Sequence, residues 1–138
     1  MEDLLTAITS RVATGPSTFY NDIGGRFYLD TAPDDRQFPD CIFLIVVDIP
    51  DNAFAKYGET VEVQFSLFSE SSGATEITTM YRDLKALFDD VKLTVTSNTM
   101  VIMKRERLVT FNEEIITAAG TQKVKHWAID YTVVLQLN

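Results

Sequence analysis

The stretch that decides the fold is VEVQFSLFSESSGATEITTMYRDLKALFDDV, residues 61–91, because the spacing of its apolar residues changes partway along. Over residues 61–67 apolar and polar residues alternate, which is typical of a strand with one buried face. After the polar break at 69–73, apolar residues recur with helical spacing over four turns. These are Ile77, Met80, Tyr81, Leu84, Leu87, Phe88 and Val91. The stretch therefore predicts a strand followed by an amphipathic helix.

The residues before this stretch predict a second helix and two more strands. Residues 3–13 form one apolar helical stripe that ends at Gly15-Pro16, since proline cannot continue the hydrogen-bond ladder of a helix. Residues 15–40 are rich in turn signals and contain a short predicted strand at 26–29. The apolar run at 41–49 predicts a strand covered on both faces and central in the sheet.

Two further strands are predicted after the helix, at residues 100–111 and 123–137. The segment between them, residues 112–122, is either a long connection or a hairpin that projects beyond the sheet. This order of elements favours an α+β fold. We expect one domain over residues 1–138, in which the N-terminal helix and the amphipathic helix pack on one face of a mainly antiparallel sheet.

The charge of the chain argues against nucleic-acid binding as its main task. Twenty acidic and twelve basic residues leave a formal net charge of −8, whereas a protein that grips DNA neutralises phosphates with Lys and Arg. The one dense basic cluster is Lys104, Arg105 and Arg107, which we expect to form a single charged patch on a strand. The longest apolar run is far shorter than the ~20 residues of a membrane span, so a cytoplasmic protein without a membrane partner is expected.

No residue pattern indicates an enzyme, a cofactor or a metal site. Cys41 and His126 are the only cysteine and histidine, which excludes the usual zinc sites within one chain. Cys41 opens the most apolar strand and is expected in the core. His126 is out of phase with the apolar residues of its strand and is expected on the polar surface. A small hydrolase that uses Cys41 and His126 as a nucleophile pair is kept as a remote alternative.

Apolar residues in the connections between strands are the most informative candidates for a functional surface. Phe54 and Tyr57 lie in the connection at 51–59, and Ile115 and Ile116 lie in the segment at 112–122. Such side chains either fold back onto their own domain or contact another subunit, because exposed apolar patches mark interfaces. In a closed ring, one patch on each subunit meets a different patch on its neighbour. We therefore predict these four residues as subunit contacts.

The ordered features of the chain resemble the tail-completion, or tail-terminator, family of long-tailed phages. The matching features are the apolar N-terminal helix, Gly25-Arg26-Phe27-Tyr28, Ala32-Pro33, Phe38-Pro39 before the strand at Ile42, Leu67-Phe68-Ser69, the helix at 75–91 and two closing strands. Two features depart from the family pattern: the segment before Gly25 is shorter, and residues 112–122 are longer than the usual tight turn.

The resemblance implies a structural protein of the virion, assembled in the host cytoplasm, that forms a ring, usually a hexamer, at the head-proximal end of the tail. Such a ring ends tail-tube polymerisation and joins tail to head. Its implied partners are copies of itself, the tail tube protein and the head–tail connector or adaptor proteins. DNA would pass through the ring without specific binding. A head-completion or adaptor protein, or a minor capsid protein at the neck, is the alternative within the same setting.

Overall fold

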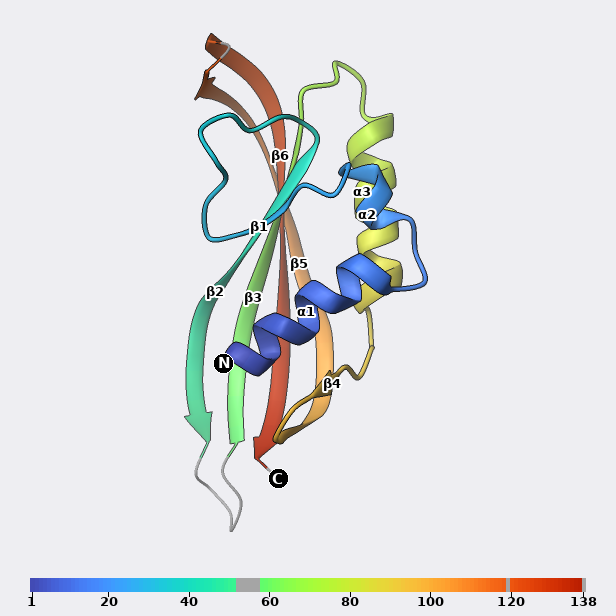
Figure 1. The fold of residues 1–138 in the computed structure, drawn as a ribbon, viewed down its shortest axis with the longest axis vertical. Helices are drawn as coiled ribbons and strands as arrows, with labels where there is room; N and C mark the ends of the chain where they lie inside the picture. Colours follow the sequence, from blue (N-terminus) through green and yellow to red (C-terminus); the bar gives the residue numbers. More distant parts are fainter. Residues whose placement is uncertain (52–57, 119, 138) are drawn as a thin grey trace.

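The computed structural model describes residues 1–51, 58–118 and 120–137. The elements follow in the order α1 (Glu2–Thr14), α2 (Phe19–Asp22), β1 (Phe27–Leu29), β2 (Asp40–Asp51), β3 (Gly58–Ser69), α3 (Thr75–Phe88), β4 (Thr94–Val95), β5 (Asn98–Thr117) and β6 (Gly120–Leu137). In these residues six strands form one sheet in the order β1-β2-β3-β6-β5-β4. All neighbours are antiparallel except β1 and β2. The α+β fold expected from the sequence is confirmed (Figure 1).

The helices cover one face of the sheet, as the apolar stripes predict. Leu4, Ile8 and Val12 are the buried residues of α1. The helix ends at Gly15, where an added Cβ would collide with the Arg11 carbonyl and the Leu87 side chain. A residue without a side chain is therefore needed where the end of α1 meets α3.

The centre of the core is aromatic and lies between β3 and α3. The Phe65 ring stacks on Phe88 at 4.9 Å between centroids and meets Tyr131 edge-on at 5.6 Å. Phe43 on β2 extends this group on the other side of Phe65. The strand and the helix of the fold-deciding stretch therefore pack directly on each other, because each turns its apolar face to the other.

The amphipathic helix is one turn shorter than its apolar pattern, which runs to Val91. It ends at Phe88, and the next residue, Asp89, leaves the helical conformation. The Asp89 carboxylate accepts a hydrogen bond of 2.6 Å from the Tyr131 hydroxyl and another from the Arg105 guanidinium. These two donors stabilise the carboxylate at a helix C-terminus, where a negative charge is otherwise unfavourable.

The prediction that the strand at 41–49 is central and covered on both faces is wrong for its second half. Strand β1 pairs only with Cys41–Phe43. From the bulge between Ile45 and Val47 onward, apolar side chains are exposed: Val46 at 47%, Val47 at 39% and Ile49 at 56%. The first residues of the apolar run are therefore buried in the sheet, whereas its last residues lie on an exposed sheet edge.

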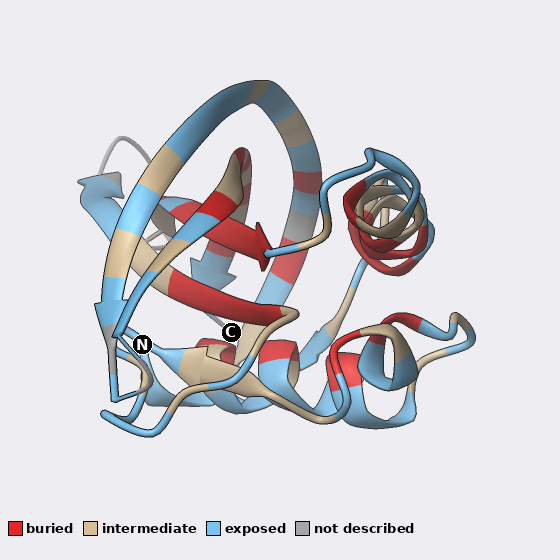
Figure 2. Ribbon diagram, turned by 90° about the horizontal axis from the view of Figure 1, so that it is seen from above, coloured by how far each residue is buried: buried red, intermediate tan, exposed pale blue. Residues whose placement is uncertain are grey.

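The segment at 112–122 is the projecting hairpin, the second of the two alternatives. Strands β5 and β6 pair continuously up to Thr117 and Gly120. They extend past the other strands of the sheet at one end of the molecule (Figure 1). The curve of β5 toward the hairpin tip is exposed over most of its length (Figure 2). In the described residues, no helix is long and apolar enough to cross a bilayer.

Candidate interaction surface

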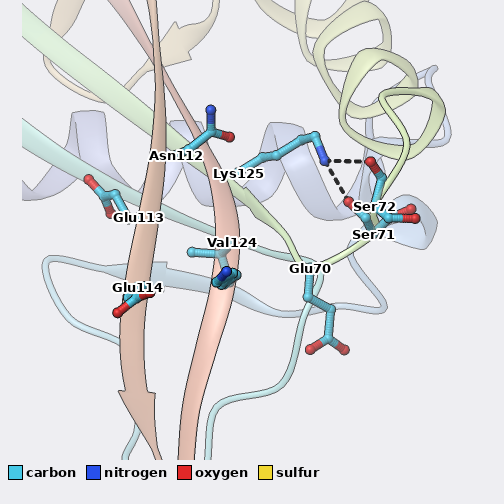
Figure 3. A pocket seen from close by; sticks show the side chains of 9 residues that line it. Glu70, Ser71, Ser72, Asn112, Glu113, Glu114, Val124 and Lys125 are labelled. Carbon is cyan, nitrogen blue, oxygen red and sulfur yellow. Dashed lines mark hydrogen bonds between the residues drawn. The ribbon is translucent and has the colours of Figure 1, made fainter.

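The end of the β5–β6 hairpin forms a two-stranded arm. Strand β3 stops at Ser69, opposite Lys125, so residues 113–117 and 120–124 have strand partners only in each other within the described chain. The Lys125 ammonium donates hydrogen bonds to the Ser71 and Ser72 carbonyls at 2.7 and 3.1 Å. These bonds tie the base of the arm to the loop before α3, across a 490 Å³ pocket (Figure 3). A hairpin alone is marginally stable in water, so such anchoring matters.

A second, smaller apolar cluster holds the arm from the face of the sheet that lacks helices. It consists of Ile42, Phe68 and Val124, with Ile115 packed against it. Residues of the segment between β1 and β2, including Ala32 and Phe38, cover the same cluster. This segment, residues 30–39, is called the strap below. The strap and the arm therefore pack on the same apolar cluster of the sheet.

Arg36 holds the strap against this cluster. Its guanidinium lies over the rings of Phe38 and Phe68, at 4.7 and 4.5 Å from their centroids. It also forms a 2.7 Å ion pair with Asp40, whose side chain is fully buried. Burial raises the pKa of Asp40, and the Arg36 charge opposes that rise. The pair keeps a buried carboxylate partnered at the start of β2.

His126 differs from its prediction as an exposed surface residue. Its side chain is only 16% exposed and stacks on Phe68 at 4.3 Å, with Phe111 at 5.3 Å. The Nδ1 atom lies 3.0 Å from a Glu113 carboxylate oxygen. The face of β6 that was expected to be polar is therefore covered at this end. The arm and the strap pack over it and bury the His126 ring among apolar side chains.

Cys41 is buried in the main core, as predicted. Burial raises the pKa of its thiol well above the ordinary value. Cys41 faces the helices, whereas His126 packs on Phe68 on the opposite face of the sheet. The structure therefore contradicts the remote alternative of a Cys41–His126 nucleophile pair. In the described residues, no three potential metal ligands gather at one place.

The basic cluster does not form the single patch that was predicted. A bulge between Arg105 and Arg107 turns their side chains to opposite faces of the sheet. Arg105 bonds Asp89 and the Tyr81 hydroxyl beside α3. Arg107 pairs with Asp130 on the helix-free face. Two of the three charges are thus used within the chain, which leaves Lys104 exposed.

The four predicted contact residues have different outcomes. Phe54 and Tyr57 lie outside the described residues. Ile115 is half-buried on the second cluster, so its own chain already covers part of it. Ile116 is 86% exposed near the tip of the arm. Of the four, Ile116 is the described side chain that remains available to a partner.

The sequence pattern missed two exposed apolar groups at the sides of the sheet. One is the β2 group, Val46, Val47 and Ile49. The other is the β5 group, Ile102, Val109 and Phe111, with exposures of 38%, 37% and 45%. Apolar runs in a sequence do not reveal which strand lies at a sheet edge, so only the strand order exposes these groups.

The comparisons with known proteins give a likeness of fold. No family model and no curated protein matches the chain. A solved chain from the virion of a native gene transfer agent particle is similar, with a TM-score of 0.62 and 10% sequence identity. The similarity covers 94% of this chain and 92% of that one. The shared fold therefore extends over nearly the whole of both chains.

Proposed function

We propose that this protein is a structural component of a virion that forms a ring at the head-proximal end of a phage tail. The ring, a hexamer in this proposal, ends tail-tube polymerisation and joins the tail to the head. The observation that carries the proposal is the fold shared with a virion chain along nearly the full length of both. The ordered sequence features that resemble the tail-terminator family support the same role.

The exposed surface of the chain supports self-association in particular. The molecule carries a projecting arm with Ile116 near its tip, and two further apolar groups lie along different strands. Large exposed apolar groups are typical of protein–protein contact sites. Different patches on one molecule suit a heterologous contact, which generates a ring when the rotation closes.

The mechanism in this proposal is geometric. One side of the ring matches the last layer of the tail tube, and the other side meets the connector or adaptor proteins of the head. The ring offers no surface on which another layer of tube protein can assemble. The net charge of −8 favours passage of DNA without adhesion, because like charges repel.

Light scattering at several protein concentrations, with and without tail tubes, tests the ring. We expect a single oligomeric mass, and a strict monomer under all these conditions would contradict it. Ile116→Asp should shift the mass toward the monomer because it places a charge on the arm, whereas Ile116→Val should keep the oligomer. Both variants should fold, since Ile116 is 86% exposed.

Electron microscopy of particles assembled without the protein tests its position. Overlong or unjoined tails are the expected result. Normal tails beside heads that leak DNA would contradict a terminator and indicate an adaptor on the head side.

A further inference from the structure

The charge of the sheet is divided between its two halves. Residues 27–69, which contain β1, β2 and β3, include eight acidic and two basic residues. Residues 98–137, which form β5 and β6, include four acidic and five basic residues. The strand order places these two groups side by side in the sheet. The segment that contains β1, β2 and β3 therefore carries a formal charge of −6, and the segment that forms β5 and β6 carries +1.

The two lateral edges of the sheet repeat this division beside their exposed apolar groups. On the β2 edge, exposed Asp48 lies between Val47 and Ile49. On the β5 edge, exposed Lys104 lies near Ile102. Neither charge has a hydrogen-bond or ion-pair partner within the described residues. Each edge thus combines exposed apolar side chains with one unpartnered charge, which is negative on β2 and positive on β5.

Neighbouring strands pair with only a short part of each edge in the described part of the chain. Strand β1 pairs with β2 only as far as Phe43. Strand β4 pairs with β5 only at Asn98 and Thr99. The outer side of β2 from residue 44 therefore has no neighbouring strand among the described elements. On β5, the Met103 carbonyl accepts a hydrogen bond from the Asp90 N–H of the segment after α3, and the outer side from residue 104 has no neighbouring strand among those elements.

We propose that these two edges bind each other between copies of the chain, so that the β2 edge of one copy packs on the β5 edge of the next. Val47 and Ile49, on the helix-free side of β2, then cover the β5 group, and Asp48 at the same edge approaches the long Lys104 side chain of the neighbour from the helix side. This inference rests on the ring of the proposed function and names its contact surfaces. A two-fold contact would instead set each edge against itself and bring like charges together, which is unfavourable.

Side chains rather than a continuous backbone ladder carry this contact. Bulges interrupt β2 between Ile45 and Val47, and β5 at two places. Pro50 on the β2 edge has no backbone N–H to donate. Bulges and proline are devices that prevent strand-to-strand pairing at an edge. The same devices protect the free subunit from uncontrolled aggregation before assembly.

Cross-linking distinguishes the proposed contact from a two-fold contact. Asp48→Cys and Lys104→Cys are treated with a short bismaleimide, each alone and as an equal mixture. Native Cys41 is buried and does not react. Cross-linked dimers should form in the mixture and not in either variant alone. Dimers in a single variant, or none in the mixture, would overturn the pairing of these edges.

A charge exchange provides a second test. Asp48→Lys and Lys104→Asp should each weaken association about fivefold, because each places like charges in contact. The double variant should recover most of the loss, since it restores an opposite pair with reversed sign. Asp35→Lys, in the exposed part of the strap, is the matched control and should leave association unchanged.

The outcomes separate this inference from the proposed ring. If the wild type forms a ring and neither test responds, the edge contact is wrong and the ring stands. If the wild type is a monomer at every concentration, including with tail tubes present, both are wrong. Circular dichroism and melting temperature of each variant show that its fold is intact.

Discussion

Replacing Asp22 with asparagine should change how the free energy of unfolding depends on pH. Asp22 on α2 and Asp83 on α3 are neighbouring carboxyl groups, and the Asp22 Oδ2 atom is buried without a hydrogen-bond partner among the described residues. A proton on Asp22 allows it to donate a hydrogen bond to Asp83. Burial, together with that bond and the Asp83 charge, raises the pKa of Asp22 from 3.8 to about 7. Burial also opposes ionisation of Asp83, but hydrogen bonds from Asp22, Arg82 and Thr18 outweigh it and lower the pKa of Asp83. The pair therefore holds one proton near neutral pH.

The raised pKa determines the direction of the effect. Between pH 4 and about 7 the folded protein keeps a proton on Asp22 that the unfolded chain has released. The free energy of unfolding therefore falls as the pH rises through this range, and the full loss is reached above pH 7. The lowered pKa of Asp83 acts below its ordinary value of 3.8, outside this range.

The magnitude follows from the size of the shift. At full weight, a rise from 3.8 to about 7 corresponds to about 4 kcal/mol. Asp22 keeps part of its surface in water, and solvent screening reduces the effect to about 1–2 kcal/mol. Asparagine is neutral and can still donate a hydrogen bond to Asp83. Asp22→Asn should therefore match the wild type near pH 4 and exceed its stability by that amount at pH 8.

Urea denaturation at pH 4, 6 and 8 at one protein concentration measures the effect. The matched control is Asp35→Asn, an exposed strap residue, which should follow the wild-type pH dependence. Parallel stability curves for Asp22→Asn and the wild type from pH 4 to 8 would refute the shared proton.

Three further predictions concern the buried contacts. Arg36→Met should lower the free energy of unfolding by about 3 kcal/mol because it leaves the buried Asp40 carboxylate unpaired; a loss below about 1 kcal/mol in urea denaturation would contradict this. Tyr131→Phe should cost about 1–2 kcal/mol by removing the 2.6 Å hydrogen bond to Asp89, and an unchanged denaturation midpoint would exclude that contribution. Cys41 should react with a thiol reagent only at the rate of unfolding, since the thiol is buried and its pKa is raised; a fast reaction in native buffer would argue against burial.

The regular elements could be predicted because each carries its own periodic signal. The alternation at 61–67 and the helical spacing at 77–88 reflect which side chains face the core, and each lies within one short segment. Helix α2 was missed because four residues are too few for a period to show. Phe19, placed in a loop by its turn-rich surroundings, is fully buried in the core.

The candidate surface could be predicted only in part. Ile116 follows from its place in an unusually long connection, and its exposure is confirmed. The setting of His126 depends on Phe68 and Glu113, which lie on the two neighbouring strands, β3 and β5. Side-chain alternation specified the face of His126, but the strap and the arm that bury that face come from distant segments.

The sequence by itself determined the types of the main elements, the α+β class and the burial of Cys41, since these depend on the local order of apolar and polar residues. Only the tertiary structure decided which strands lie at the edges of the sheet. That order depends on long-range strand pairing, and it sets β2 and β5 on opposite sides of the sheet, each with exposed apolar side chains. An apolar run has the same composition in a covered strand and at an open edge. Whether the run is buried or exposed depends on whether a neighbouring strand covers it.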